Sequence, residues 1–111
     1  MDCIFCKIAS KEIKSSIVYE DESVLAFNDI NPQAPIHIVV IPKEHIATLN
    51  DVKDFGIYEK IFIAIDKIVK DLKVEKDGYR IVANCNKNGG QTVFHIHFHI
   101  LAGRYMEWPP G

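Results

Sequence analysis

The spacing of hydrophobic and polar positions along the chain predicts a mixed α+β fold. Runs rich in β-branched and aromatic residues predict strands at residues 17–20, 24–27, 37–41, 79–84 and 92–101. Most neighbouring runs are joined by short turns, which favours antiparallel pairing. We therefore expect about five strands in an antiparallel sheet.

One long amphipathic helix is predicted between residues 52 and 73. Apolar side chains there recur at the i, i+3, i+4 and i+7 spacing, and Asp51 is a suitable N-cap residue. Further isoleucines widen the apolar surface beyond one stripe, so the helix either packs on a broad core or is also covered by a second subunit. Residues 3–9 predict a short helix or turn, and residues 86–90 predict a loop.

Length and charge narrow the class of protein. The 111 residues, 48% of them hydrophobic, suit a single domain that spans residues 1–111 and needs no disulfide staples. A net charge of −2 gives no indication of nucleic-acid binding, and no apolar run approaches the length of a membrane span. The N-terminus lacks an export pattern, so we expect a cytoplasmic protein.

Histidines dominate the candidate chemistry. His95, His97 and His99 occupy alternate positions of the last predicted strand, so their side chains should share one face. Three imidazoles in a row contribute little apolar burial, which favours a functional role: metal binding, nucleophilic attack or acid–base chemistry. Residues 88–92 include two glycines and could bind an anion just before the strand, which favours phosphate chemistry.

The histidines belong to a longer pattern. Residues 95–101 match the alternating histidine and apolar signature of the histidine triad (HIT) superfamily. The chain also resembles the Hint branch of that superfamily at residues 28–35, 37–45, 89–93 and 108–111, so the resemblance spans almost the whole chain. It implies a HIT-like fold with sheets joined in a homodimer. It also implies hydrolysis of purine nucleoside phosphoramidates of the adenosine 5′-monophosphoramidate type.

The resemblance implies a covalent mechanism. His97 corresponds to the nucleophile that attacks the α-phosphorus and forms a nucleotidyl-histidine. His99 corresponds to the residue that contacts the phosphate and helps the leaving amine depart, and His37 to the histidine that supports the ring network.

Other positions match the nucleotide-binding residues of the branch. The ribose is expected at Asp29, the phosphate at Asn84, Gly90, Gln91, Thr92 and Val93, and the base at Phe5, Ile8, Ile13 and Ile30. Trp108 matches a tail residue that reaches the site of the partner subunit. Without the resemblance, the four apolar residues would be interpreted as ordinary core.

A second set of residues suggests a metal. Cys3 and Cys6 have Cys-x-x-Cys spacing, which vertebrate Hint proteins lack and many microbial histidine triad proteins have. In those microbial proteins the pair binds zinc with two histidines, which here correspond to His45 and His95. The resemblance therefore implies a structural zinc site and no organic cofactor. A redox pair and buried thiols without metal are the alternatives.

Three other functions are compatible with parts of the pattern. One is a dinucleoside polyphosphate hydrolase or nucleotidyl transferase of another HIT branch, which shares the nucleophile. Another is a nucleotide- or zinc-binding scaffold module in which catalysis is incidental. A zinc hydrolase using His95, His97 and His99 together is disfavoured, because ligands at i, i+2 and i+4 of one strand suit a tetrahedral ion poorly.

Overall fold

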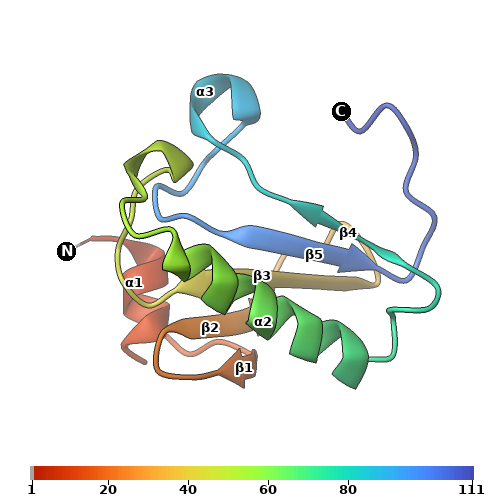
Figure 1. Ribbon diagram of the computed structural model, residues 1–111, viewed down its shortest axis with the longest axis horizontal. Helices are drawn as coiled ribbons and strands as arrows, with labels where there is room; N and C mark the ends of the chain where they lie inside the picture. Colours follow the sequence, from red (N-terminus) through yellow and green to blue (C-terminus); the bar gives the residue numbers. More distant parts are fainter. Residues whose placement is uncertain (1) are drawn as a thin grey trace.

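The computed structural model describes residues 2–111, which form a five-stranded sheet with helices on both faces (Figure 1). In chain order the elements are α1 (Ile4–Ala9), β1 (Ile17–Glu20), β2 (Val24–Asn28), β3 (Ile36–Pro42), the 3-10 helix η1 (Leu49–Asp51), α2 (Gly56–Asp71), β4 (Tyr79–Val82), α3 (Asn86–Gly89) and β5 (Phe98–Ala102). The strand order is β1-β2-β3-β5-β4, and every pair is antiparallel. The predicted α+β class and antiparallel sheet are confirmed.

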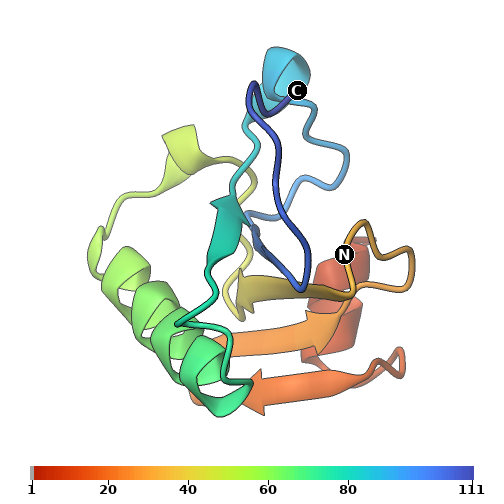
Figure 2. The ribbon, with the colours of Figure 1, turned by 90° about the vertical axis from the view of Figure 1, so that its right-hand side faces the viewer.

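The two faces of the sheet have separate cores. Ile38 and Val40 of β3 belong to the hydrophobic cluster under α2, whereas Val39 and Ile41 belong to the cluster under α1. This follows from the period of two along a strand, which sends successive side chains to opposite faces. Figure 2 shows α2 on the left of the sheet and α1 on the right. The α2 cluster contains more buried residues than the α1 cluster, so α2 packs on the sheet through a larger hydrophobic core than α1 does.

The long helix begins at Gly56, later than predicted. Asp51 does not cap this helix. Its side chain instead accepts the backbone N–H of Thr48, and the two residues form the capping box of η1. Val52 then adopts an extended conformation, with φ −69° and ψ 123°, which interrupts the helical path. The helix ends at Asp71, slightly before the predicted end.

The last strand is also shorter than predicted. β5 begins at Phe98, and residues 92–97 lie outside any helix or strand. Ile96 donates its backbone N–H to the carbonyl of Ile46, which lies in a loop (2.7 Å). Alternation still holds, because Ile96, Phe98 and Ile100 all lie in the cluster under α2, as predicted. The first two histidines therefore precede the strand.

Two further details differ from prediction around β4. The strand stops at Val82 rather than at residue 84, and residues 86–89 form the short helix α3 rather than a loop. Gly90 ends α3 with φ +78°, a left-handed conformation that glycine adopts at little cost.

The outer surface of α2 carries apolar side chains that the chain does not cover. Phe62 is 46% exposed and Ile63 is 45% exposed, so part of the wide apolar surface predicted for this helix faces away from the core. Within the described residues, no helix combines the length and the apolar character needed to cross a bilayer.

Candidate active site and metal centre

His97 is held in one orientation and one tautomer. Its ring is buried, and its Nδ1–H donates to the backbone carbonyl of His95 (2.8 Å). Since a carbonyl can only accept, the proton of a neutral His97 ring must sit on Nδ1. The Nε2 atom then carries the lone pair, which is the arrangement that a nitrogen nucleophile needs.

A second chain of hydrogen bonds fixes His37 and His99. The backbone N–H of Gln33 donates to Nδ1 of His37 (3.0 Å), so the ring proton of neutral His37 is on Nε2. That Nε2–H donates to Nδ1 of His99 (2.8 Å), which places the proton of neutral His99 on Nε2. The rings of His97 and His99 contact each other edge to face, with centroids 4.9 Å apart. One ring thus offers a lone pair beside another ring that offers a proton.

Burial keeps both rings neutral near pH 7. Burial lowers the pKa of His97 below its ordinary value of 6.5, against the opposing effects of the His95 carbonyl and of Asp29. Burial also lowers the pKa of His99, to about 4, and the neighbouring His97 and His37 add to this shift. A neutral His97 can act as a nucleophile without first losing a proton.

Asp29 lies at the edge of this histidine network. One carboxylate oxygen accepts the backbone N–H of Asn31 (2.8 Å), and the other lies 3.4 Å from Nε2 of His37. The side chain is partly exposed, so its remaining lone pairs can accept from a ligand.

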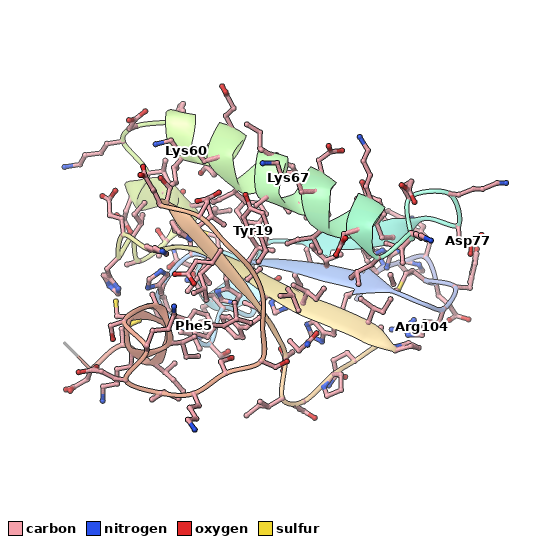
Figure 3. The ribbon with its side chains drawn as sticks, turned by 90° about the horizontal axis from the view of Figure 1, so that it is seen from below. Phe5, Tyr19, Lys60, Lys67, Asp77 and Arg104 are labelled. Atoms are coloured by element: carbon pink, nitrogen blue, oxygen red, sulfur yellow. The ribbon has the colours of Figure 1, made fainter. Side chains whose placement is uncertain are left out.

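Phe5 links α1 to the histidines. Its ring contacts His97 edge to face at 5.1 Å and His95 at 5.9 Å, and it also packs on Phe27 at 5.5 Å. In Figure 3, Phe5 lies on the side of α1 that faces the sheet. Ile8, one turn along α1, is buried in the same cluster.

Cys3, Cys6, His45 and His95 come together as predicted, with one donor atom from each lying within 4.8 Å of the others. The Nδ1 atoms of His45 and His95 are 3.3 Å apart, and Sγ of Cys6 lies 3.3 and 3.6 Å from them. Sγ of Cys3 lies 3.4 Å from His95 Nδ1. Ligand atoms of a tetrahedral zinc ion are separated by roughly 3.3–3.8 Å, so these four donors fit that metal.

His95 is oriented for this role by a further hydrogen bond. Its Nε2–H donates to the carbonyl of Pro42 (2.7 Å), which leaves Nδ1 unprotonated and directed at the cysteines. The ring is fully buried, and burial lowers its pKa. Cys3 is also the N-cap residue of α1, because its sulfur accepts the backbone N–H of Cys6.

A second group, Asp29, His37 and His99, fits a hydrogen-bonded relay better than a metal. The two imidazole nitrogens that face each other there are 2.8 Å apart, a hydrogen-bond distance. Two nitrogen ligands of one tetrahedral ion lie roughly 3.3 Å apart. The geometry thus fits a metal ion at the cysteine–histidine cluster and a hydrogen-bonded relay at Asp29, His37 and His99.

Gln91 has a structural role in the loop before β5. It is buried, its Oε1 accepts the backbone N–H of Asn86 (2.9 Å), and its Nε2 donates to the carbonyls of Ala47 (2.8 Å) and Val93 (3.0 Å). The side chain therefore joins α3, the segment after β3 and its own loop. Its expected contribution to phosphate binding rests on the loop shape that it maintains.

Most of the other predicted nucleotide-binding residues lie at accessible positions. Thr92, Gly90, Ile13 and Ile30 are exposed, and Val93 is half-buried. Ile30 is 98% exposed, so it can contact a ligand without moving.

Two more of the predicted residues, Trp108 and Asn84, lie in the C-terminal tail and just after β4. Trp108 is exposed, and the Arg80 guanidinium lies over its ring at 5.9 Å while donating to the carbonyl of Glu107 (3.0 Å). Asn84 is half-buried and lines a cavity of about 680 Å³ between β4 and the tail.

Two residues that support the relay were missed by sequence reasoning. Gln33 sets the His37 tautomer through its backbone, and Arg104 holds Gln33 by donating twice to its carbonyl (2.9 and 3.2 Å). Figure 3 shows Arg104 near the opposite end of the sheet from Phe5. Gln33 could not be predicted because every residue except proline has a backbone N–H, so the sequence does not mark this donor. Arg104 could not be predicted because its contact with residue 33 joins parts of the chain that are far apart in the sequence.

Comparisons with known proteins agree with this geometry. The HIT domain family matches residues 10–106. The chain is 49% identical over 111 residues to the "14 kDa zinc-binding protein" of Zea mays, covering 97% of this chain and 87% of that protein. It is 47% identical over 106 residues to the "Purine nucleoside phosphoramidase" of Escherichia coli K12, covering 93% and 88%.

Solved structures give the same result. The crystal structure of a HIT family hydrolase from Legionella pneumophila superposes with a TM-score of 0.96 at 51% identity, covering 99% of this chain and all of that one (100%). A histidine triad protein from Clostridium difficile superposes with a TM-score of 0.94 at 51% identity, covering 96% of this chain and 95% of that one. The five-stranded sheet, the paired histidines 97 and 99 and these matches together show that the chain belongs to the HIT domain family.

Proposed function

We propose that this protein is a nucleotide hydrolase that cleaves purine nucleoside phosphoramidates of the adenosine 5′-monophosphoramidate type through a covalent intermediate on His97. The observation that carries the proposal is the 2.8 Å hydrogen bond from Nδ1–H of His97 to the His95 carbonyl, which leaves Nε2 as a nucleophile. The name of the Escherichia coli relative supports the choice of substrate.

The reaction takes two displacements. The Nε2 lone pair of His97 attacks phosphorus, and the bond from phosphorus to the leaving nitrogen breaks. That nitrogen accepts a hydrogen bond from Nε2–H of His99, takes up a proton from solvent and departs as the amine, so His99 stays neutral. Water then attacks phosphorus, the bond from phosphorus to His97 breaks, and the extra proton of the water is released to solvent. The net reaction is phosphoramidate plus water to nucleoside monophosphate plus amine.

The remaining residues bind the nucleotide in this proposal. Asp29 accepts from the ribose hydroxyls, a bidentate role that suits a carboxylate. The base lies against Phe5, Ile8, Ile13 and Ile30. The phosphate lies near Asn84 and the loop that contains Gly90, Gln91, Thr92 and Val93, whose backbone N–H groups can stabilise the developing charge.

We also propose that Cys3, Cys6, His45 and His95 hold a structural zinc ion. The donor separations support this, and the maize relative is named as a zinc-binding protein. When bound, zinc crosslinks the N-terminal segment to the two loops that carry the histidines, and it has no open position for substrate.

A homodimer is part of the proposal. Among residues 2–111, β4 pairs with β5 alone, so its outer edge is available to a second copy. The exposed Phe62 and Ile63 on α2 and Tyr79 on β4 supply apolar surface for it. In this arrangement Trp108 reaches the partner's site. We further propose that the chain acts as a single domain, in the cytoplasm.

The direct test is to trap the intermediate. The protein is mixed with a slowly hydrolysed adenosine phosphoramidate, quenched, digested and analysed by mass spectrometry. We expect an adenylyl group on His97 and no adduct with His97→Ala, which should still bind adenosine monophosphate. An adduct on another residue, or near-normal turnover by His97→Ala, would refute the assignment.

A substrate comparison separates the main alternative. Turnover of adenosine phosphoramidate should exceed turnover of diadenosine tetraphosphate. The reverse order would place the protein among the dinucleoside polyphosphate hydrolases. If His97→Ala still performs the role of the protein in cells, a scaffold function is favoured.

A further inference from the structure

His95 contacts both the candidate metal site and the proposed nucleophile, His97. Its side chain joins the cysteine–histidine cluster through Nδ1, and its own backbone carbonyl accepts the proton of His97 Nδ1. The same residue thus presents one atom to the metal centre and another to the catalytic ring. The ring is fully buried and donates to the carbonyl of Pro42, so a shift of the ring also displaces the backbone of the same residue.

The backbone around His95 is not held by a strand ladder, because residues 92–97 are outside the sheet. Ile96 is buried in the cluster under α2, and Gln91 Nε2–H donates to the carbonyl of Val93. The hydrogen bonds closest to the carbonyl of His95 are the one from Ile96 N–H to Ile46 O and the one from His95 Nε2–H to Pro42 O. Pro42 precedes His45 and Ile46 follows it, so both bonds tie residues 95 and 96 to the segment that carries His45. The position of the carbonyl therefore depends on how firmly His45 and His95 are held together.

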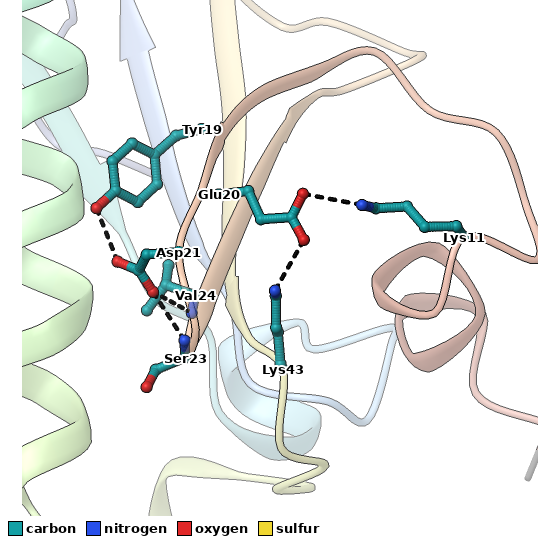
Figure 4. Close-up of polar contacts among 7 residues, drawn as sticks. All are labelled: Lys11, Tyr19, Glu20, Asp21, Ser23, Val24 and Lys43. Atoms are coloured by element: carbon teal, nitrogen blue, oxygen red, sulfur yellow. Dashed lines mark hydrogen bonds and ion pairs between the residues drawn. The ribbon is translucent and has the colours of Figure 1, made fainter.

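The helix α1 provides a second connection to the nucleophile. It has six residues, too few to be stable alone, and Cys3 and Cys6 lie at its N-terminal end. Between them is Phe5, whose ring contacts both His95 and His97. After α1, Lys11 forms an exposed ion pair with Glu20, which also binds Lys43 (Figure 4). Such exposed pairs contribute little.

We propose that the metal centre controls the nucleophile: when Cys3, Cys6, His45 and His95 hold zinc, they fix the carbonyl of His95 and the ring of Phe5, and these fix the tautomer and orientation of His97. His95 is then a positioning residue as well as a metal ligand. The inference rests on the proposed function for its effect on turnover, but not for its effect on the His97 ring.

The consequence of losing metal is local. The larger core under α2 contains no member of the cluster, so the sheet and α2 should remain folded. Without a fixed carbonyl, neutral His97 can place its proton on either nitrogen, and only one of the two tautomers is a nucleophile at Nε2. Misplacement of a reacting group by about 1 Å can cost about 100-fold in rate, so we expect a loss of about 10- to 100-fold in kcat.

The experiment uses His45→Ala, which removes the exposed member of the cluster and should weaken zinc binding without abolishing it. Zinc is titrated into the full-length variant at about pH 8, where an ordinary imidazole is neutral. Four quantities are followed: zinc content, far-UV circular dichroism, the ¹⁵N chemical shifts that report the His97 tautomer, and kcat at saturating phosphoramidate. Cys85→Ser is the matched control, because Cys85 lies outside the cluster.

We expect the Nδ1–H tautomer of His97 and kcat to rise together with zinc occupancy while the circular dichroism stays constant. Cys85→Ser should match the wild type throughout. The proposal is overturned if the tautomer stays fixed as occupancy changes, or if the circular dichroism is lost in step with zinc, which would make the metal a global stabiliser. If the wild type turns over no phosphoramidate, the proposed function fails, and the tautomer measurement still decides the coupling.

Discussion

Replacing Gln91 with leucine tests whether this side chain holds the loop before β5 together. Leucine has a similar size but removes three hydrogen bonds at once, to Asn86, Ala47 and Val93. Each such bond contributes about 1 kcal/mol net, so the free energy of unfolding should fall by about 3 kcal/mol. Because Gln91 is buried, water cannot easily replace the lost partners.

The assay is urea-induced unfolding followed by circular dichroism, with a melting temperature measured in parallel. A loss of about 3 kcal/mol corresponds to a fall of roughly 10–20 °C in Tm for a domain of this size. Gln33→Leu is the control, because the Gln33 side chain is exposed and makes one hydrogen bond, to Asn31 O. It should change stability by less than about 0.5 kcal/mol. A loss below about 1 kcal/mol for Gln91→Leu would show that the loop does not depend on this side chain.

Three further predictions concern the ribose, the loop and acid. Asp29→Ala should weaken binding of adenosine monophosphate about 10- to 100-fold, and of its 2′,3′-dideoxy analogue much less, by calorimetry; equal losses would exclude a ribose contact. Gly90→Ala should cost about 1–2 kcal/mol in urea unfolding because φ is +78°, whereas Gly89→Ala, which meets only ordinary contacts, should cost less. Stability should fall as the pH falls from about 6.5 toward about 4, because the unfolded chain takes up a proton at His99 in that range and the folded chain does not. His99→Gln should flatten this slope in unfolding measured across pH, and an unchanged slope would show that other groups cause it.

The parts of the fold that could be predicted are those in which one local rule decides. The alternation of Ile96, Phe98 and Ile100 follows from the period of two, and the structure buries all three. The predicted ends of helices were wrong where a second residue nearby offered a better hydrogen-bonding partner. Asp51 is a good N-cap for α2 by sequence, but Thr48 engages it three residues earlier. Capping preferences identify an end of a helix without saying which helix.

The candidate metal site was predictable because zinc ligands are side chains of two distinctive types. The pairing of Cys3 and Cys6 with His45 and His95 required the resemblance, since the two histidines are separated from the cysteines by long stretches of chain. The supports of these side chains were not predictable. The carbonyl groups of Pro42 and His95 accept the hydrogen bonds that set the tautomers of His95 and His97. Every residue type has a carbonyl group, so the sequence does not mark these two.

The relay around His99 shows why these backbone supports matter for the chemistry. His99 offers a proton on Nε2 because His37 donates to its Nδ1, and His37 does so because Gln33 donates to the other side of the His37 ring. Arg104 in turn holds the Gln33 carbonyl with two N–H groups. His97 is set in the same way by a backbone group, the carbonyl of residue 95. A neutral histidine ring can carry its proton on Nδ1 or on Nε2, so the identity of the residue does not determine which nitrogen attacks or donates. In this protein the backbone of two irregular segments makes that choice, so the roles we propose for His97 and His99 differ although the two histidines lie only two positions apart in one signature.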